Sequence, residues 1–272
     1  MQNILDRIIA HKRLEVDRRS AQHPVEALMD SAGYGRQRRN LCRAIEESKD
    51  FGIIAEFKRK SPSQQDINLE ADPVAVAKGY VEAGAAAISC LTDVQFFGAK
   101  PDDIDRMRAA VEVPIIRKDF IIDRYQVHEA RAMGADAILL IATCLSAAQL
   151  DELAEEAGEL GMQVVCEVHD EDEVAKISPS VDIIGVNNRD LGTFKVDISR
   201  SLELEPILPP GILRISESGI EDPQSIVKLR REKFRGFLIG TYFMRQADPG
   251  RACADFIRKT HTIHDTYKDA IA

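Results

Sequence analysis

The 272-residue sequence has no tryptophan, only five cysteines and no long apolar run. The cysteines include no CxxC pair and no zinc-ligand spacing, which favours structural thiols over metal ligands. No segment reaches the roughly 20 apolar residues that span a bilayer, and the charged N-terminus lacks the apolar core of a signal peptide. We therefore expect a cytoplasmic protein without a membrane partner.

Basic residues are outnumbered by acidic ones. The net charge of −9 argues against general binding to nucleic acid or to acidic membranes. A local cluster of lysine and arginine would still allow a small anionic molecule to bind. With 44% hydrophobic residues, the chain is long enough for one well-buried core.

The hydrophobic pattern changes at residue 51. Residues 1–50 carry an imperfect apolar stripe on charged segments, which predicts a helical extension, with a loop over 31–40. From residue 51 onward, short apolar strands alternate with amphipathic helices, as is typical of a parallel α/β fold. The expected strands cover 52–57, 85–91, 113–118, 136–142, 162–167, 181–187, 212–217 and 235–240.

Eight strands, each followed by a helix, predict a single (β/α)8 TIM barrel over residues 51–272, which makes one domain overall with its N-terminal helical extension. An open doubly wound sheet is the alternative, but no GxGxxG loop follows any strand. The extension would then fold over the barrel mouth or its base. The expected barrel helices cover 73–83, 101–110, 123–133, 147–160, 170–177, 197–205, 222–230 and 248–260.

Polar side chains stand at the carboxyl ends of five expected strands. Barrel strands are buried on both faces, and their carboxyl ends form the active-site mouth in this fold. Side chains two positions apart share a face, and each series is apolar until its last members. Solvated strand ends would explain any one of these residues, but five strands in the same phase favour a pocket. The residues predicted to converge there are Glu56, Lys58, Lys118, Glu167, Asn187 and Glu217.

Glycines follow the seventh and eighth expected strands, Gly219 in SESGIEDP and Gly240 in IGTYFMR. Backbone N–H groups at such junctions bind anions, and barrels often hold phosphate between these two loops. Together the loops predict a phosphate site beside the pocket.

Two further patterns are weaker. Glu56 and Glu167 resemble the carboxyl pair of a glycosidase, but the neighbouring lysines would keep both of them ionised. His169 follows Glu167 closely in the sequence and is near enough to approach the mouth, but its loop position favours a surface histidine.

A series of motifs resembles the indole-3-glycerol phosphate synthase family. The N-terminal ILDRIIAHKRLEV is similar to that family's opening helix, so the resemblance covers nearly the whole chain. The other motifs are EFKRKSPS (56–63), LTD with FF (91–97), PIIRKDF (114–120), GADAILLIA (134–142), CEVHD (166–170), GVNNRDL (185–191), SESGI (216–220) and FLIGTYFMR (237–245).

The resemblance implies a carboxy-lyase of tryptophan biosynthesis. It would convert 1-(2-carboxyphenylamino)-1-deoxyribulose 5-phosphate into indole-3-glycerol phosphate, carbon dioxide and water. No metal and no organic cofactor are implied, and the only partner would be this small phosphorylated substrate. We expect a monomer or a weak homo-oligomer that binds no nucleic acid.

The resemblance also assigns residues to roles. Lys118 would protonate the substrate ketone, and Lys58 and Glu167 would share the acid and base steps of dehydration. The positions that match the family's catalytic residues are Lys118, Lys58, Glu167, Glu56, Asn187, Glu217 and Ser218. The implied phosphate-binding residues are Ser61, Lys60, Arg189, Gly219, Gly240 and Thr241. The implied slot for the aromatic ring consists of Phe97, Phe120, Leu139 and Leu191.

Two loops depart from the family pattern. Gln64-Gln65-Asp66 stands where the family usually has a glycine, and Gly98-Ala99-Lys100 stands where it usually has x-Gly-Ser. Loss of glycine would stiffen a first loop that closes over substrate, so we expect slow lid opening or slow product release. Thr241 replaces the commoner serine and keeps the hydroxyl.

Three alternatives use the same barrel. Lys118 would be the nucleophile of a Schiff-base aldolase if a neighbouring cation lowered its pKa. The altered loops would suit a binding protein that has lost turnover. Phosphoribosylanthranilate isomerase shares the barrel and the phosphate site, but its acid–base pair does not explain EFKRKSPS or RKDF. A turnover assay separates these functions.

Overall fold

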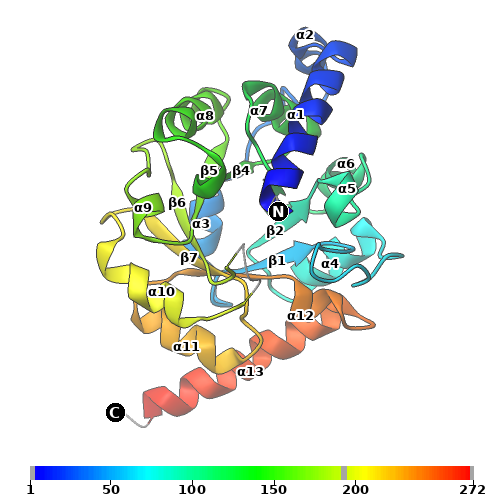
Figure 1. Ribbon diagram of the computed structural model, residues 1–272. Helices are drawn as coiled ribbons and strands as arrows, with labels where there is room; N and C mark the ends of the chain where they lie inside the picture. Colours follow the sequence, from blue (N-terminus) through cyan, green and yellow to red (C-terminus); the bar gives the residue numbers. More distant parts are fainter. Residues whose placement is uncertain (1–3, 191–194, 270–272) are drawn as a thin grey trace.

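The chain forms a closed barrel of eight parallel strands, in the order β1 to β8 around the ring (Figure 1). The computed structural model describes residues 4–190 and 195–269. The closed ring confirms the predicted (β/α)8 barrel and excludes the open doubly wound sheet. The strands are β1 (Ile53–Phe57), β2 (Ala87–Leu91), β3 (Ile115–Lys118), β4 (Ala137–Ile141), β5 (Gln163–Val168), β6 (Ile183–Asn187), β7 (Leu213–Glu217) and β8 (Gly236–Ile239).

Helices surround this ring, as the alternating sequence pattern predicts. The predicted helix over 170–177 is shorter than expected, because the backbone changes to i+3 turns after Val174, ahead of Pro179. The outer helices are α4 (Pro73–Glu82), α6 (Asp103–Ala110), α7 (Arg124–Met133), α8 (Ala147–Glu159), α9 (Glu171–Val174), α10 (Ser199–Leu204), α11 (Pro223–Arg231) and α13 (Pro249–Asp269). Short segments between them are α5 (Val94–Phe97), η1 (Ala142–Cys144), η2 (Glu205–Ile207) and α12 (Thr241–Met244).

The apolar side chains form two cores, which follow from the period-two alternation of the strands. A large cluster fills the space between strands and outer helices. A smaller cluster fills the barrel interior and includes Ile54, Ile116, Val165 and Ile215. Each of these four precedes a polar cavity residue by two positions on the same face, so the filled interior forms the floor below the mouth.

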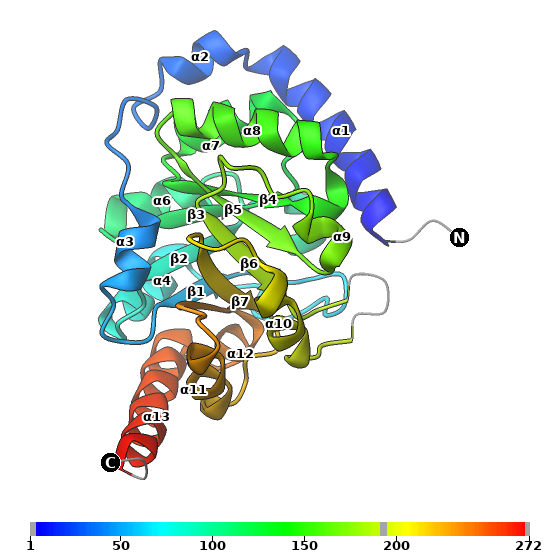
Figure 2. The ribbon, with the colours of Figure 1, turned by 90° about the vertical axis from the view of Figure 1, so that its left-hand side faces the viewer.

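Helices of the N-terminal segment lie over both ends of the barrel. Its helices are α1 (Ile4–Gln22), α2 (Val25–Met29) and α3 (Leu41–Glu46). Leu41 and Ile45 of α3 pack into the interior cluster and close the base. Figure 2 shows α3 and the beginning of α1 at opposite ends of the barrel, and Ile8 of α1 faces the cavity at the mouth. The sequence predicted that the extension covers either the mouth or the base of the barrel, and in the structure it covers both.

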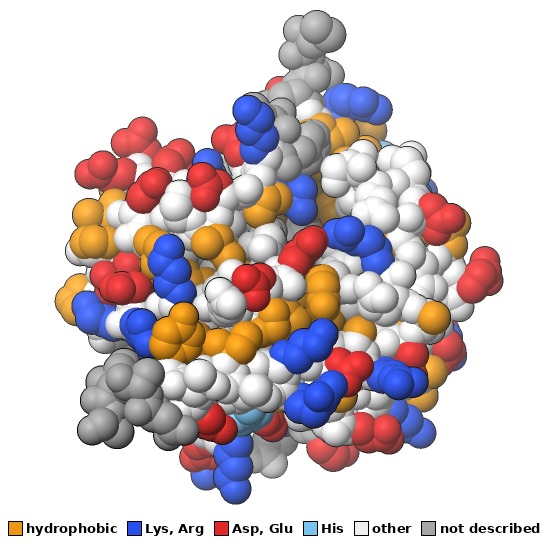
Figure 3. Space-filling model, turned by 90° about the horizontal axis from the view of Figure 1, so that it is seen from below, with side chains coloured by type: hydrophobic (Ala, Val, Ile, Leu, Met, Phe, Trp, Pro, Cys, Tyr) orange, Lys and Arg blue, Asp and Glu red, His pale blue; other side chains and the backbone are white. Residues whose placement is uncertain are grey.

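The surface and the helices agree with the composition of the sequence. Figure 3 shows basic side chains interspersed with acidic ones on the face that includes α13. Among the described residues, the helices lack the combination of length and apolar character needed to cross a bilayer.

All five cysteines are free, and burial raises the pKa of Cys144, Cys166 and Cys253 to about 12. Those three thiols therefore stay protonated, as expected of structural cysteines.

Candidate active site

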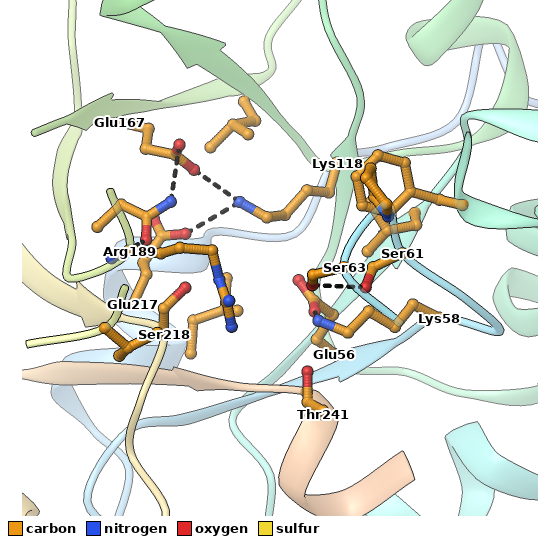
Figure 4. A pocket seen from close by; sticks show the side chains of 18 of the residues that line it. Glu56, Lys58, Ser61, Ser63, Lys118, Glu167, Arg189, Glu217, Ser218 and Thr241 are labelled. Atoms are coloured by element: carbon orange, nitrogen blue, oxygen red, sulfur yellow. Dashed lines mark hydrogen bonds and ion pairs between the residues drawn. The ribbon is translucent and has the colours of Figure 1, made fainter. Parts of the chain in front are cut away.

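A cavity of about 480 Å³ opens at the carboxyl ends of the strands. It brings together nearly all of the predicted site residues, from strands and loops that are far apart in the sequence (Figure 4). Those that line it are Glu56, Lys58, Ser61, Phe97, Lys118, Phe120, Leu139, Glu167, Asn187, Arg189, Glu217, Ser218, Gly219, Gly240 and Thr241.

Two predicted residues are not part of this lining. Strand β1 ends at Phe57, three residues before Lys60, so strand alternation does not set the direction of the Lys60 side chain. Nζ of Lys60 instead donates to the carbonyl oxygen of Gln95, at 2.9 Å. Lys60 is not among the residues that line the cavity, and its assignment to the phosphate stays a prediction. Leu191, predicted for the ring slot, lies outside the described residues.

Lys118 reaches into the cavity from the end of β3 and contacts two carboxylates. Its Nζ lies 2.8 Å from Oε2 of Glu167 and 3.0 Å from Oε2 of Glu217. Burial alone would lower the pKa of Lys118, but these carboxylates, with Glu56 further away, outweigh it and raise the pKa above its usual range. The ammonium group is therefore charged and fixed in direction.

The two carboxyls beside Lys118 differ in their other contacts. Oε1 of Glu167 accepts a hydrogen bond from Nδ2 of Asn187, at 3.0 Å. Burial opposes its ionisation, but Lys118, His169 and the Asn187 hydrogen bond lower the pKa of Glu167. Oε1 of Glu217 has no hydrogen-bond partner among the described residues, and burial raises the pKa of Glu217. Glu167 is thus the ionised carboxylate, and Glu217 is the one that holds a proton most readily.

A second ion pair lies across the cavity, at the end of β1. Nζ of Lys58 donates to Oε1 of Glu56 at 2.6 Å, and both side chains are largely buried. Figure 4 shows this pair on the opposite side of the cavity from Glu167. A Cβ at Gly240 would collide with the Glu56 carboxylate, so glycine at this position lets Glu56 fit against β8. The cavity therefore presents two ammonium groups from different strands.

The loops after β1, β6, β7 and β8 form a polar end. Oγ of Ser61 lies 3.2 Å from Oγ of Ser63, and Figure 4 shows both hydroxyls, Thr241 and the guanidinium of Arg189 facing the cavity. Ser218 and Gly219 have positive φ angles of 66° and 75°, which turn the chain sharply after β7. Hydroxyls, a guanidinium and turned backbone suit a phosphate group.

The remaining wall is apolar. The rings of Phe97 and Phe120 lie with their centroids 6.0 Å apart, and Leu139 lies deeper in the barrel. Ile4 and Ile8 of α1 close this side. A flat aromatic ring fits between such side chains.

Comparison with known proteins agrees with this geometry. The sequence model described as indole-3-glycerol phosphate synthase matches residues 5–256. The enzyme of that name from Bacteroides thetaiotaomicron is 47% identical over 258 residues, covering 95% of this chain and 99% of the relative. The one from Salinibacter ruber is 44% identical, covering 92% and 93%. The chain belongs to the indole-3-glycerol phosphate synthase family.

Members of the indole-3-glycerol phosphate synthase family are decarboxylating lyases of tryptophan biosynthesis, EC 4.1.1.48. Among solved structures, tryptophan synthase subunit alpha from Legionella pneumophila matches with a TM-score of 0.57 and 13% identity, covering 83% of this chain and 98% of that one. At this identity the match shows only the shared barrel fold.

The prediction of a surface position for His169 is wrong. Its side chain is 7% exposed, and Nε2 lies 3.4 Å from Oε1 of Glu167. The loop after β5 turns directly into α9, whose Glu173 holds the imidazole inward through a contact of 3.0 Å with Nδ1. A signal was present in the sequence, because His169 lies two positions after Glu167 and so continues the strand face of Val165 and Glu167.

Sequence reasoning also missed the anchoring of α1. Nζ of the buried Lys12 lies 2.9 Å from Oδ2 of Asp93 and 2.9 Å from Oδ1 of Asp119. The apolar stripe that includes Ile4 and Ile8 was visible in the sequence, and it marks the face that covers the cavity. The buried lysine within a charged stretch gave no separate signal.

Proposed function

We propose that this cavity is where the chain carries out the reaction of its family. The substrate is 1-(2-carboxyphenylamino)-1-deoxyribulose 5-phosphate, and the products are indole-3-glycerol phosphate, carbon dioxide and water. The apolar wall would hold the carboxyphenyl ring, and Arg189, Ser61, Gly219 and Thr241 would bind the phosphate at the polar end. The ketone would then lie between these ends, within reach of the two lysines.

The contacts of Lys118 Nζ with Glu167 and Glu217, at 2.8 and 3.0 Å, are the observation that carries the proposal. Ring closure needs a proton donor at the ketone oxygen while the aromatic carbon attacks the carbonyl carbon. The ammonium of Lys118 supplies that proton: its N–H bond breaks as the new O–H bond forms. Loss of carbon dioxide then restores the aromatic ring. Held by Glu167 and Glu217, the ammonium is fixed in direction before substrate binds.

The dehydration step uses the other groups. Lys58, oriented by Glu56, gives a proton to the departing hydroxyl, which leaves as water. Glu167 accepts the proton that the ring intermediate loses, because its lowered pKa keeps it in the basic form. Asn187 and Ser218 bind the substrate's hydroxyls beside them. Glu217 completes this wall.

Two alternatives are less well supported. A Schiff-base aldolase needs a neutral amine at Lys118, but two adjacent carboxylates raise the pKa of this group rather than lower it. A binding protein without turnover would not need both lysine–carboxylate arrangements, each of which takes charged groups out of water.

A turnover assay on the purified chain tests the proposal. Fluorescence should report indole-3-glycerol phosphate, with one carbon dioxide released for each product molecule. Substrate binding without product would support the binding protein, and trapping of a ketose phosphate by borohydride would support the aldolase. One domain over 51–272 with residues 1–50 as its extension, a cytoplasmic location and a monomeric or weakly associated state stay predictions.

A further inference from the structure

An imidazole stands beside the catalytic carboxylate but outside the cavity. Nε2 of His169 lies 3.4 Å from Oε1 of Glu167, whereas Lys118 contacts the other oxygen, Oε2. His169 is 7% exposed and does not contribute to the cavity lining. It can therefore act on the reaction only through Glu167.

The imidazole is held from its other nitrogen. Oε2 of Glu173 lies 3.0 Å from Nδ1 of His169 and also accepts the backbone N–H of His169, at 2.7 Å. The hydroxyl of Thr143 donates to Oε1 of the same carboxyl. Asp170 caps α9 by accepting the backbone N–H of Glu173, at 2.9 Å. Glu173 is thus fixed at the first turn of a helix and aims Nδ1–H away from the cavity.

The charges around His169 favour its protonated form. Burial lowers the pKa of His169, but the hydrogen bond to Glu173 and the charges of Glu167, Glu173 and Glu217 outweigh it and raise the pKa. Two cations stand further away: Lys118 beyond Glu167, and Lys176, whose Nζ donates to the carbonyl oxygens of Ala142 and Leu145. With Nδ1 donating to Glu173, a neutral ring would place a lone pair near the Glu167 carboxylate, whereas an imidazolium places a positive charge there. This contact of 3.4 Å is between charges, since Nε2 has no hydrogen-bond partner among the described residues.

We propose that His169 is a positioning residue whose imidazolium keeps Glu167 ionised and in place while Lys118 gives its proton to the substrate. Before that step Glu167 has two cationic neighbours. When the proton leaves Lys118, its amine becomes neutral and His169 is the cation that remains in contact with Glu167. Glu167 therefore stays available as the base of the later step. This inference rests on the proposed function, since it assigns a partner to that reaction's base.

Nitrogen-15 NMR of histidine-labelled protein tests the charge without reference to activity. Wild type should show a signal from an imidazole with both nitrogens protonated at pH 7 that the His169→Gln protein lacks. Glu173→Gln should keep the signal but titrate at lower pH, because the amide removes an anion and retains the shape. A neutral His169 at pH 6 in wild type would overturn the proposal.

The pH dependence of kcat tests the consequence for Glu167. Wild-type kcat should fall as pH rises through the pKa of His169, because the imidazolium is lost. His169→Gln should lack that fall, and its acidic limb should move up by about one pH unit, since a nearby charge shifts a carboxyl pKa by roughly 1–3 units. In Glu173→Gln the alkaline fall should move to lower pH rather than disappear. KM should change little in both variants.

A matched control uses another histidine–glutamate contact, in which the histidine side chain is 17% exposed. Nε2 of His128, on α7, lies 2.8 Å from Oε1 of Glu156, outside the cavity. His128→Gln should leave both limbs in place. If His169→Gln kept both wild-type limbs, or if it and His128→Gln lost activity alike with unshifted limbs, His169 would have no more than a structural role. Absence of product from wild type would instead refute the proposed function, and the NMR titration would still report on His169.

Discussion

Gly185 on β6 makes room for Glu217 on β7. A Cβ at Gly185 would collide with Oε1 of Glu217, the carboxyl oxygen that has no hydrogen-bond partner among the described residues. The two residues lie on paired strands, and both side-chain directions point into the barrel. The second carboxylate contact of Lys118 therefore depends on the absence of a side chain at Gly185.

Gly185→Ala should lower kcat by roughly 10²-fold, because a displacement of about 1 Å near the chemistry can cost that much. The added methyl pushes Glu217 aside and loosens Lys118, while the phosphate end is unaffected, so KM should change little. The control is Gly158→Ala on α8, where an added Cβ meets nothing within 4 Å. Steady-state kinetics of both variants make the comparison, and equal kcat values would contradict the account.

Much of this site follows from the sequence because it obeys strand periodicity. Ile116 and Lys118, and likewise Val165 and Glu167, alternate as barrel strands require, so their shared inner face was predictable. The fold itself followed from a different pattern, the eight strands that are each followed by a helix. The local sequence was enough to predict the direction of a side chain wherever a regular helix or strand sets that direction.

The rest depends on contacts between distant segments. Glu173 of α9 holds the imidazole of His169 beside Glu167. Lys60 comes after the end of β1 and donates to the carbonyl oxygen of Gln95 instead of lining the cavity. The need for glycine at Gly185 appears only when the rotamer of Glu217 is known. Lys60 and Gly185 have no periodic signal in a single sequence, whereas His169 continues the alternation of Val165 and Glu167.

Lys12→Met should destabilise the protein by about 3 kcal/mol, because it leaves buried carboxylates without their cation. Lys12 bridges α1 to Asp93 and Asp119 at the mouth, so α1 should also pack less firmly over the cavity and KM should rise. Arg18→Met, at an exposed position on the same helix, serves as the control. Urea unfolding and steady-state kinetics measure both effects, and a Lys12→Met protein as stable as the control would refute them.

The ion pair between Lys12 and Asp119 gives a prediction for stability in acid. Burial opposes ionisation of Asp119, but Lys12 and Arg117 outweigh it and lower the pKa of Asp119 well below its usual range. Its contribution to stability is therefore complete above about pH 4, the unfolded value, and is lost as pH falls toward the folded value. Without Lys12 this pKa shift is smaller. The stability difference between wild type and Lys12→Met should therefore narrow as pH falls below about 4, and a constant difference would contradict this.

Arg189→Gln should raise KM by about 10- to 100-fold, since a hydrogen bond to a charged group contributes about 1.5–3 kcal/mol. Inorganic phosphate should inhibit wild type competitively, and its inhibition constant should rise by a similar factor in the variant. Arg258→Gln, on the exposed face of α13, is the control for loss of one positive charge. A variant that loses kcat while keeping phosphate inhibition would remove Arg189 from the phosphate site.

The altered first loop should limit release of product. Ser61 and Gln64 exchange backbone hydrogen bonds of 2.7 and 3.1 Å, which close a tight turn. Among the described non-glycine residues only Phe51, Ser218 and Lys233 have positive φ, so Gln64 fits this turn without strain. We expect single-turnover rates to exceed steady-state rates, and Gln64→Gly to narrow the gap. Equal rates in wild type would refute slow release.

The central claim is that the ammonium of Lys118, held between Glu167 and Glu217, donates the proton for ring closure. Measuring kcat and KM of Lys118→Met tests it most directly, because methionine keeps the length of the side chain and removes the proton. The account predicts a fall in kcat of about 10²- to 10⁴-fold with little change in KM. Turnover close to that of wild type would remove Lys118 from the chemistry and contradict the account.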